Sequence, residues 1–176
     1  ILIVEDEAII AADLAGKLER LGYEVAGITA EGQEAVALAS HLRPHLVLMD
    51  ISLSGSMDGI EAAVEIHQQT DIPIIFISAF TDEELIGRAK EASPYGYIVK
   101  PFEKRNLSTV ISLSLHKYQL ERSLNDSLAK LQVMLTGALH AIGKTVEFRD
   151  PYTAGHQRRV GNLSRAIAVR MGLPPE

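Results

Sequence analysis

The sequence predicts an α/β fold, in which a flavodoxin-like, doubly wound, five-stranded parallel sheet is followed by a long α-helix and a further helical segment. Short apolar runs alternate with segments of helical periodicity, which is the pattern of consecutive βαβ units. Most of the apolar runs are continuous rather than alternating, as expected for strands that are buried on both faces of a parallel sheet. Right-handed crossovers and the common doubly wound strand orders then favour the flavodoxin-like topology.

The first half of this pattern contains three strands and two helices. Ile1–Val4 is a continuous apolar run, and the apolar residues over positions 9–21 recur at helical spacing until a glycine ends the helix. Tyr23–Ile28 is predicted as a second strand, and its mixed polarity suits the edge of a sheet. Gly32–Leu42 is predicted as a helix, and His45–Met49 as the third strand.

The second half repeats the alternation. A polar loop leads into a helix over positions 58–69, and Ile72–Ile77 is predicted as the fourth strand. Thr81–Ala92 is predicted as a helix, because its first residue and the glutamate three positions later form a capping box. Tyr95–Val99 is the fifth strand, and another helix begins near Glu103.

This last helix continues far beyond the sheet pattern, because no proline occurs between Pro101 and Pro151. A helix from Glu103 to about Glu147 would be roughly 65 Å long at 1.5 Å per residue. Its apolar residues follow the alternating 4,3 spacing of a heptad seam: Leu124, Leu128, Leu131, Leu135, Ala138 and Ile142. Two interpretations remain, namely two shorter helices of one bundle or a parallel dimeric signalling helix. We favour the dimer, because an exposed leucine seam requires a partner.

The remaining segment has a helix start at Asp150-Pro151-Tyr152-Thr153, followed by a basic helix over residues 156–171. About 30 residues are too few for a separate core, so we interpret this segment as the beginning of a further domain. We therefore expect three parts: a domain over residues 1–116, a helical coiled-coil linker over 117–146, and a domain fragment over 147–176.

Composition supports this division and excludes several function classes. The chain has 176 residues, a net charge of −6 and no cysteine, which excludes disulfides, zinc–thiolate sites and thiol nucleophiles. Residues 1–102 hold 17 acidic and 6 basic residues, whereas residues 103–176 hold 6 acidic and 11 basic residues. Such an asymmetry indicates two segments with different roles. A net negative chain is a poor non-specific nucleic-acid binder.

Side chains with a carboxylate, a hydroxyl or an amine follow four of the predicted strands. Glu5 and Asp6 follow the first strand, Asp50 the third, Ser78 the fourth and Lys100 the fifth. Because ligands bind at the carboxyl ends of the strands in an open parallel sheet, we expect these five side chains to converge on one site.

The residue types predict the chemistry of this site. Clustered carboxylates repel one another, and a hard divalent cation such as Mg²⁺ relieves that repulsion. Asp50 could then act as a nucleophile that forms an acyl phosphate. Lys100 would supply a positive charge to the phosphoryl oxygens, and the Ser78 hydroxyl would bind one of them only after phosphorylation.

These residues stand in motifs that resemble the receiver domain of two-component response regulators. The motifs are Ile3-Val4-Glu5-Asp6-Glu7, Leu48-Met49-Asp50, Met57-Asp58-Gly59, Ser78-Ala79 and Tyr97-Ile98-Val99-Lys100-Pro101-Phe102. The resemblance covers residues 1–116 and implies that Asp50 accepts a phosphoryl group from a sensor histidine kinase.

The same resemblance implies further roles. Glu5, Asp6, Asp50 and the backbone carbonyl of Ser52 would bind Mg²⁺. Ser78 and Tyr97 would form a switch pair, and the Lys100–Pro101 bond would be cis. One departure is visible, since the loop after Asp50 lacks the usual proline and is one residue longer.

The C-terminal segment resembles the opening of an HD-GYP domain, a metal-dependent phosphohydrolase class that acts on cyclic di-GMP. The resemblance rests on residues 147–160, which include Asp150-Pro151-Tyr152-Thr153-Ala154-Gly155-His156. It implies that His156 contributes to a metal centre of iron or manganese in the intact protein. A glutamate that supports a third metal in some members is replaced here by Tyr152, so we expect two metals. The ligands that complete the centre are absent from this sequence, so we expect no hydrolysis by these 176 residues.

The sequence therefore predicts a phosphorylation-controlled switch that signals through a long helix to an HD-GYP-like output. We expect a histidine kinase and a second copy of the chain as partners, and no membrane or nucleic acid. The alternative is a nucleic-acid-binding or protein-interaction output, for which Arg158, Arg159, Arg165 and Arg170 could contact phosphates. No apolar run reaches the length of about 20 residues that a membrane span needs, and no signal peptide pattern is present, so a cytoplasmic location is expected.

Overall fold

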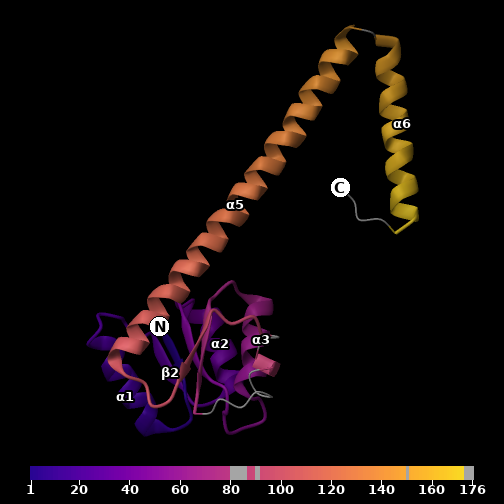
Figure 1. Cartoon of the computed structure of the whole chain (residues 1–176). Coiled ribbons are helices and arrows are strands. Elements are labelled where there is room, and N and C mark those ends of the chain that lie inside the picture. The colour runs from indigo at the N-terminus through magenta and orange to yellow at the C-terminus, as the bar shows by residue number, and fades with distance from the viewer. Residues whose placement is uncertain (80–86, 90–91, 150, 173–176) are drawn as a thin grey trace. The chain divides into compact units, whose positions relative to one another are not determined.

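The computed structural model describes residues 1–79, 87–89, 92–149 and 151–172, and it divides the chain into two compact units, Ile1–Arg122 and Ser123–Glu176. The first unit contains a five-stranded, fully parallel sheet in the order β2-β1-β3-β4-β5 (Figure 1). This is the flavodoxin-like order, so the predicted fold class is confirmed. The strands are β1 Leu2–Val4, β2 Gly27–Thr29, β3 Val47–Asp50, β4 Ile74–Ser78 and β5 Gly96–Val99.

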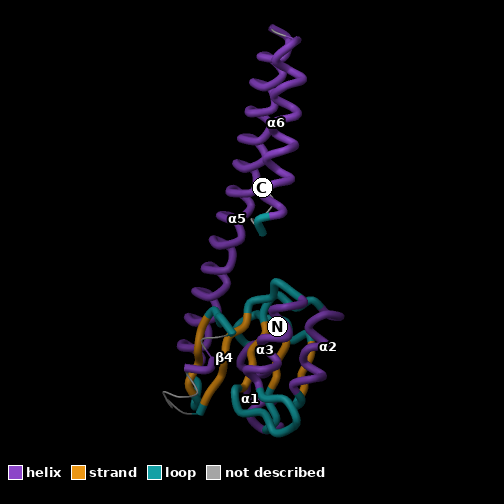
Figure 2. The backbone as a smooth tube through the Cα atoms, turned by 90° about the vertical axis from the view of Figure 1, so that its right-hand side faces the viewer, coloured by secondary structure: helices purple, strands orange, loops and turns teal. Residues whose placement is uncertain are grey.

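Helices cover both faces of this sheet (Figure 2). The described helices are α1 Ala8–Glu19, α2 Gly32–Leu42, α3 Gly59–Gln69, α5 Lys104–Arg149 and α6 Pro151–Arg170. Successive residues of a strand point to opposite faces, and this separates two buried cores. Leu2 and Val4 pack in the core that contains residues of α2 and α3, whereas Ile3 packs with residues of α1 and α5. The continuous apolar strands of the sequence are thus explained by burial on both sides.

The predicted strand Tyr23–Ile28 is wrong over most of its length, because β2 comprises only Gly27–Thr29. The amide of Tyr23 donates to the carbonyl of Leu18 at the end of α1, 3.0 Å away, rather than to a strand. Tyr23 and Val25 pack against the core on the α1 and α5 side. This packing, rather than membership of a β-strand, accounts for the apolar side chains at these two positions. The other described strands and helices differ from the prediction only at their ends.

The predicted helix Thr81–Ala92 lies largely outside the described residues, and so does its capping box. Residues 87–89 are described there and are helical. The bounds of α2 agree with the prediction, and α3 begins after Asp58, whose carboxylate accepts a hydrogen bond from the amide of Glu61 in a capping box.

Helix α5 is one continuous helix of 46 residues, as the absence of proline predicted. Its first turns are amphipathic, and Leu107, Ile111 and Ser114 are buried against the sheet. Because the chain forms a single helix from Lys104 to Arg149, the alternative of two shorter helices over this range is wrong.

A polar and aromatic cluster, which we call the Tyr95–Tyr118 cluster, joins α5 to the beginning of β5. The two rings meet edge to face with centroids 5.6 Å apart, and Lys117 Nζ lies 5.3 Å from the centroid of Tyr95. The Tyr118 hydroxyl donates to Asp71 Oδ2 at 3.3 Å, and Ser114 Oγ donates to the carbonyl of Tyr95 at 3.1 Å. Burial, followed by neighbouring acidic side chains, raises the pKa of Tyr95 to about 12. The cluster therefore holds α5 where β5 begins.

In the second unit, the apolar residues of the heptad seam are exposed. Leu124, Leu128, Leu131, Leu135 and Ile142 each keep between 52% and 61% of their surface accessible. Such a row of large apolar side chains is unusual on the surface of a monomer. Among the described residues, no helix combines the length and the apolar character that crossing a bilayer requires.

Candidate functional site

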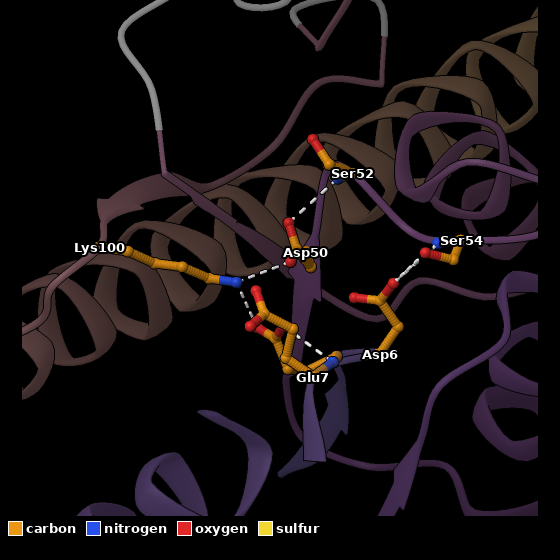
Figure 3. Close-up of polar contacts among 7 residues, drawn as sticks. Asp6, Glu7, Asp50, Ser52, Ser54 and Lys100 are labelled. Atoms are coloured by element: carbon orange, nitrogen blue, oxygen red, sulfur yellow. Dashed lines mark hydrogen bonds and ion pairs between the residues drawn. The ribbon is translucent and has the colours of Figure 1, made fainter. Parts of the chain in front are cut away.

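Four charged side chains meet at the carboxyl edge of the sheet (Figure 3). Asp50 is the last residue of β3, Glu5 and Asp6 directly follow β1, and Lys100 directly follows β5. These strand ends lie along one edge because β1 pairs with β3, only β4 separates β3 from β5, and the parallel strands all end at the same edge. The structure thus brings together the acidic and basic residues that the sequence placed at three strand ends.

Lys100 is the centre of the charge network. Its Nζ lies 2.6 Å from Glu5 Oε2 and 2.7 Å from Asp50 Oδ2. Glu5 and Asp50 are 2% and 5% exposed, so both carboxylates are almost fully removed from water. Salt screens an ion pair little when the pair is shielded from water, so the attraction between Lys100 and the two carboxylates stays strong. This attraction constrains the position of the Lys100 side chain.

Burial and pairing perturb the acid–base properties of this network. Burial, reinforced by the nearby charge of Asp50, raises the pKa of Glu5 even though Lys100 opposes the change. The largest single influence on Lys100 is burial, which lowers its pKa, but the hydrogen bonds and ion pairs with Asp50 and Glu5 outweigh it and raise the pKa. In the metal-free site Glu5 is therefore protonated more easily than an exposed glutamate, and Lys100 holds its proton more tightly than an exposed lysine.

The loop between β3 and α3 supplies hydrogen bonds to two of the carboxylates. The amide of Ser52 donates to Asp50 Oδ1 at 3.0 Å. The amide of Ser54 donates to Asp6 Oδ2 at 3.0 Å, and Ser54 Oγ donates to the same oxygen. Hydrogen bonding by Ser54 is the main reason that the pKa of Asp6 is lowered. Sequence reasoning missed Ser54, and only the departure in loop length pointed to this segment.

The end of the same loop lies directly against Asp50. The amide of Gly59 donates to the carbonyl of Ile51 at 3.1 Å, and a Cβ at position 59 would lie 1.8 Å from the carbonyl oxygen of Asp50. Asp58 caps α3 and accepts a hydrogen bond from Arg88 Nη2 at 2.7 Å. Glycine at position 59 is therefore required by space, and it brings the start of α3 next to Asp50.

Ser78 and Tyr97 occupy neighbouring strands near the same edge. Ser78 ends β4, and its carbonyl accepts a hydrogen bond from the amide of Lys100 at 2.8 Å. Tyr97 lies on β5 with 37% of its surface exposed, and its ring centroid is 6.0 Å from that of Phe76. The Lys100–Pro101 bond is cis, as the resemblance implied. A switching role for Ser78 and Tyr97 stays a prediction.

The donor set fits a hard divalent cation. Ligand atoms of Glu5, Asp6 and Asp50 lie within 4.8 Å of one another, and all are carboxylate oxygens. Three carboxylates and the ammonium of Lys100 leave two negative charges, which a divalent cation would balance. Carboxylate oxygen is the ligand that Mg²⁺ prefers. The cluster is thus compatible with Mg²⁺, whereas a contribution from the Ser52 carbonyl stays a prediction.

The predicted output-domain residue His156 lies in α6, whose bounds are Pro151–Arg170. Its side chain lies outside the part of the chain that the structure describes. Within the described residues, the group of three acidic or histidine side chains that could hold a metal is the one formed by Glu5, Asp6 and Asp50.

Comparison with known proteins matches residues 1–112 to the response regulator receiver domain. The transcriptional regulatory protein PdtaR of Mycobacterium tuberculosis is 40% identical over 135 residues, which are 77% of this chain and 65% of that protein. The chain spans between 45% and 65% of the length of the curated relatives that it matches.

Solved structures of receiver domains also match this chain. The signal receiver domain of a modulated diguanylate cyclase from Desulfovibrio desulfuricans G20 matches with a TM-score of 0.65 and 44% identity, over 68% of this chain and 95% of that one. The receiver domain of the sensor histidine kinase PA1611 from Pseudomonas aeruginosa PAO1 matches with a TM-score of 0.61 and 30% identity, over 65% of this chain and 95% of that one. That structure contains a magnesium ion coordinated in its active site cleft.

Proposed function

Because this chain belongs to the response regulator receiver family, we propose that it is a phosphorylation-controlled switch whose phosphoacceptor is Asp50. The observation that carries the proposal is the pairing of a buried Asp50 with Lys100 at the carboxyl edge of the sheet. A carboxylate held next to a fixed positive charge is suited to receive an anionic phosphoryl group. In this proposal residues 1–116 form the receiver, 117–146 the linker and 147–176 the start of an output domain.

The reaction transfers a phosphoryl group from a phosphohistidine of the kinase. One Asp50 carboxylate oxygen forms a new bond to phosphorus while the nitrogen–phosphorus bond of the donor breaks. The imidazole leaves with the electron pair of that bond and is reprotonated. Lys100 Nζ, which is 2.7 Å from Asp50 Oδ2, offsets the negative charge that arrives on the phosphoryl oxygens.

Mg²⁺ would be held by Glu5, Asp6, Asp50 and the backbone carbonyl of Ser52. When bound, it would supply the positive charge that lets anionic donor and acceptor approach each other. The compatible cluster of three carboxylates supports this assignment. The PA1611 receiver domain, with its coordinated magnesium ion, supports it by similarity.

The signal would pass from Asp50 to the switch pair and then to α5. Ser78 ends the strand beside β5, so its hydroxyl could bind a phosphoryl oxygen while Tyr97 changes its position. The exposed leucine seam of α5 would pair with a second copy of the chain in parallel. We place this switch in the cytoplasm, with a sensor histidine kinase as its phosphodonor.

The proposed output is an HD-GYP-like phosphohydrolase in the intact protein. The support is the sequence of residues 147–160, in which His156 would be one ligand of a two-metal centre of iron or manganese. Cyclic di-GMP hydrolysis would then require the remainder of that domain.

The test of the phosphoacceptor is labelling with a small-molecule donor such as acetyl phosphate in the presence of Mg²⁺. The wild-type chain is expected to take up one phosphoryl group, and Asp50→Asn none, as measured by intact-protein mass. Asp13→Asn is the matched control, because Asp13 pairs with Lys17 on α1 and lies outside the charge network. Labelling that persisted in Asp50→Asn would overturn the assignment.

A second candidate is a receiver that controls a nucleic-acid-binding output. It is favoured by the exposed Arg159, Arg165 and Arg170 of α6 and by the similarity to PdtaR, a transcriptional regulatory protein. In that case the chain would bind a DNA duplex with an affinity that falls steeply as salt rises. Fluorescence anisotropy at two salt concentrations distinguishes this candidate from the first.

A further inference from the structure

The loop between β3 and α3 contacts the acidic cluster at two successive points. Ser52 and Ser54 are exposed and donate to Asp50 and Asp6, whereas Leu53 between them is 8% exposed and packs in the core beside α2 and α3. Ser52 thus reaches the cluster through its backbone amide, Ser54 reaches it through its amide and its hydroxyl, and the buried Leu53 anchors the segment between them.

Two further contacts hold this loop in place. At its end, the amide of Gly59 donates to the carbonyl of Ile51, which closes the loop at its base. In its middle, Met57 lies against Gly32 at the start of α2, where an added Cβ would be 3.0 Å from the Met57 carbonyl oxygen. The position of Ser54 is therefore set by contacts on both sides and does not depend on Asp6 alone.

Ser54 holds one side of the Asp6 carboxylate. Both of its hydrogen bonds end on Oδ2 of Asp6. Figure 3 shows Ser54 on one side of Asp6, while the second carboxylate oxygen of Asp6 points back towards Asp50 and Lys100. A carboxylate that is fixed by one oxygen in this way presents the other oxygen to the cluster.

We propose that Ser54 is a positioning residue that orients Asp6 for the divalent cation before the cation arrives. The inference rests on the magnesium site of the proposed function. Groups that hydrogen-bond to metal ligands fix their orientation, and removal of such a group typically weakens metal binding about 10–100-fold. Because the backbone amide of Ser54 would remain in a side-chain variant, we expect an effect at the lower end of this range.

The test is the Mg²⁺ affinity of the full chain, measured by isothermal titration calorimetry. Ser54→Ala should bind Mg²⁺ about tenfold more weakly than the wild-type chain. Ser54→Thr, which keeps the hydroxyl, should restore most of the affinity. Ser56→Ala is the matched control from the same exposed loop and should bind like the wild-type chain.

The outcomes separate this inference from the proposed function. If the wild-type chain and Ser54→Ala bind Mg²⁺ equally well, or if the variant binds more tightly, the role of Ser54 is refuted and the magnesium site stands. If the wild-type chain itself binds no Mg²⁺, the magnesium site fails. Far-UV circular dichroism without Mg²⁺ checks that the variants are folded, so that a weaker affinity reports on Asp6 and not on unfolding.

Discussion

Replacement of Gly59 by alanine tests whether the start of α3 is in van der Waals contact with Asp50. The new Cβ would lie 1.8 Å from the Asp50 carbonyl oxygen, 2.9 Å from its carbonyl carbon and 3.1 Å from Ile51 Cα. Ordinary contact begins at 3.4 Å, so the backbone must separate by about 1.6 Å at the closest point. All three neighbouring atoms belong to the backbone, so no side chain can rotate away to relieve the clash.

The expected cost has two parts. Overpacking in a well-packed region costs about 1–3 kcal/mol. The separation would also break the hydrogen bond from the Gly59 amide to the Ile51 carbonyl, which is worth about 1 kcal/mol. We therefore expect Gly59→Ala to lower the free energy of unfolding by about 3 kcal/mol. Since Asp50 moves with its carbonyl, uptake of phosphate should also fall.

Urea unfolding followed by tyrosine fluorescence measures this loss. Four of the five tyrosines lie in the unit Ile1–Arg122, so the signal reports mainly on the receiver. Gly16→Ala is the control, because its Cβ would meet the mobile end of Arg20 at an ordinary 3.6 Å. Within α1, alanine should raise stability by about 0.5–1 kcal/mol. A Gly59→Ala chain as stable as the wild type would refute the reasoning.

Two further predictions concern the charge network and the seam. Because the pKa of Glu5 is raised in the folded state, mainly by burial, the metal-free protein should lose stability as the pH rises from the ordinary glutamate value of 4.5 through the raised folded value. Glu5→Gln should remove this pH dependence of stability in urea unfolding curves measured with EDTA. Added Mg²⁺ should stabilise the wild-type chain but not the variant. A variant whose stability varies with pH like that of the wild-type chain would contradict the assignment to Glu5. In the leucine seam, Leu131 is exposed in the single chain and would be buried by pairing of two copies. Leu131→Glu should therefore weaken self-association at least tenfold in analytical ultracentrifugation, because a charge would replace a leucine whose burial is worth about 1.5–3 kcal/mol in each copy. Val133→Glu, at a more exposed position outside the seam, should associate like the wild-type chain. Equal behaviour of both variants would exclude the seam as the contact.

The sequence predicted the sheet and the acidic cluster well, because both depend on local patterns. Continuous apolar runs followed by a charged residue mark the end of a buried strand, and this was enough to bring Asp50 and Lys100 to the same edge. Helix α2 was predicted with its observed bounds, because polar residues and a following proline limit it on both sides.

Features that depend on the path of loops were not predicted. The apolar residues Tyr23 and Val25 led to the prediction of a strand, but these residues pack against the core beside α1. The contact of Ser54 with Asp6 joins residues 48 positions apart through an irregular loop. No periodicity in the sequence encodes such a contact, so only the anomalous length of the loop drew attention to it.

The Tyr95–Tyr118 cluster has a practical consequence for protein engineering. The match to the receiver family ends at residue 112, yet Ser114 and Tyr118 lie beyond it and hold α5 to β5. The compact unit accordingly extends to Arg122, whose Nη1 donates to the Tyr118 hydroxyl at 3.4 Å. A chimera that joins this receiver to a foreign output module should place its junction after Arg122, since an earlier cut would divide the cluster that holds α5 to the start of β5.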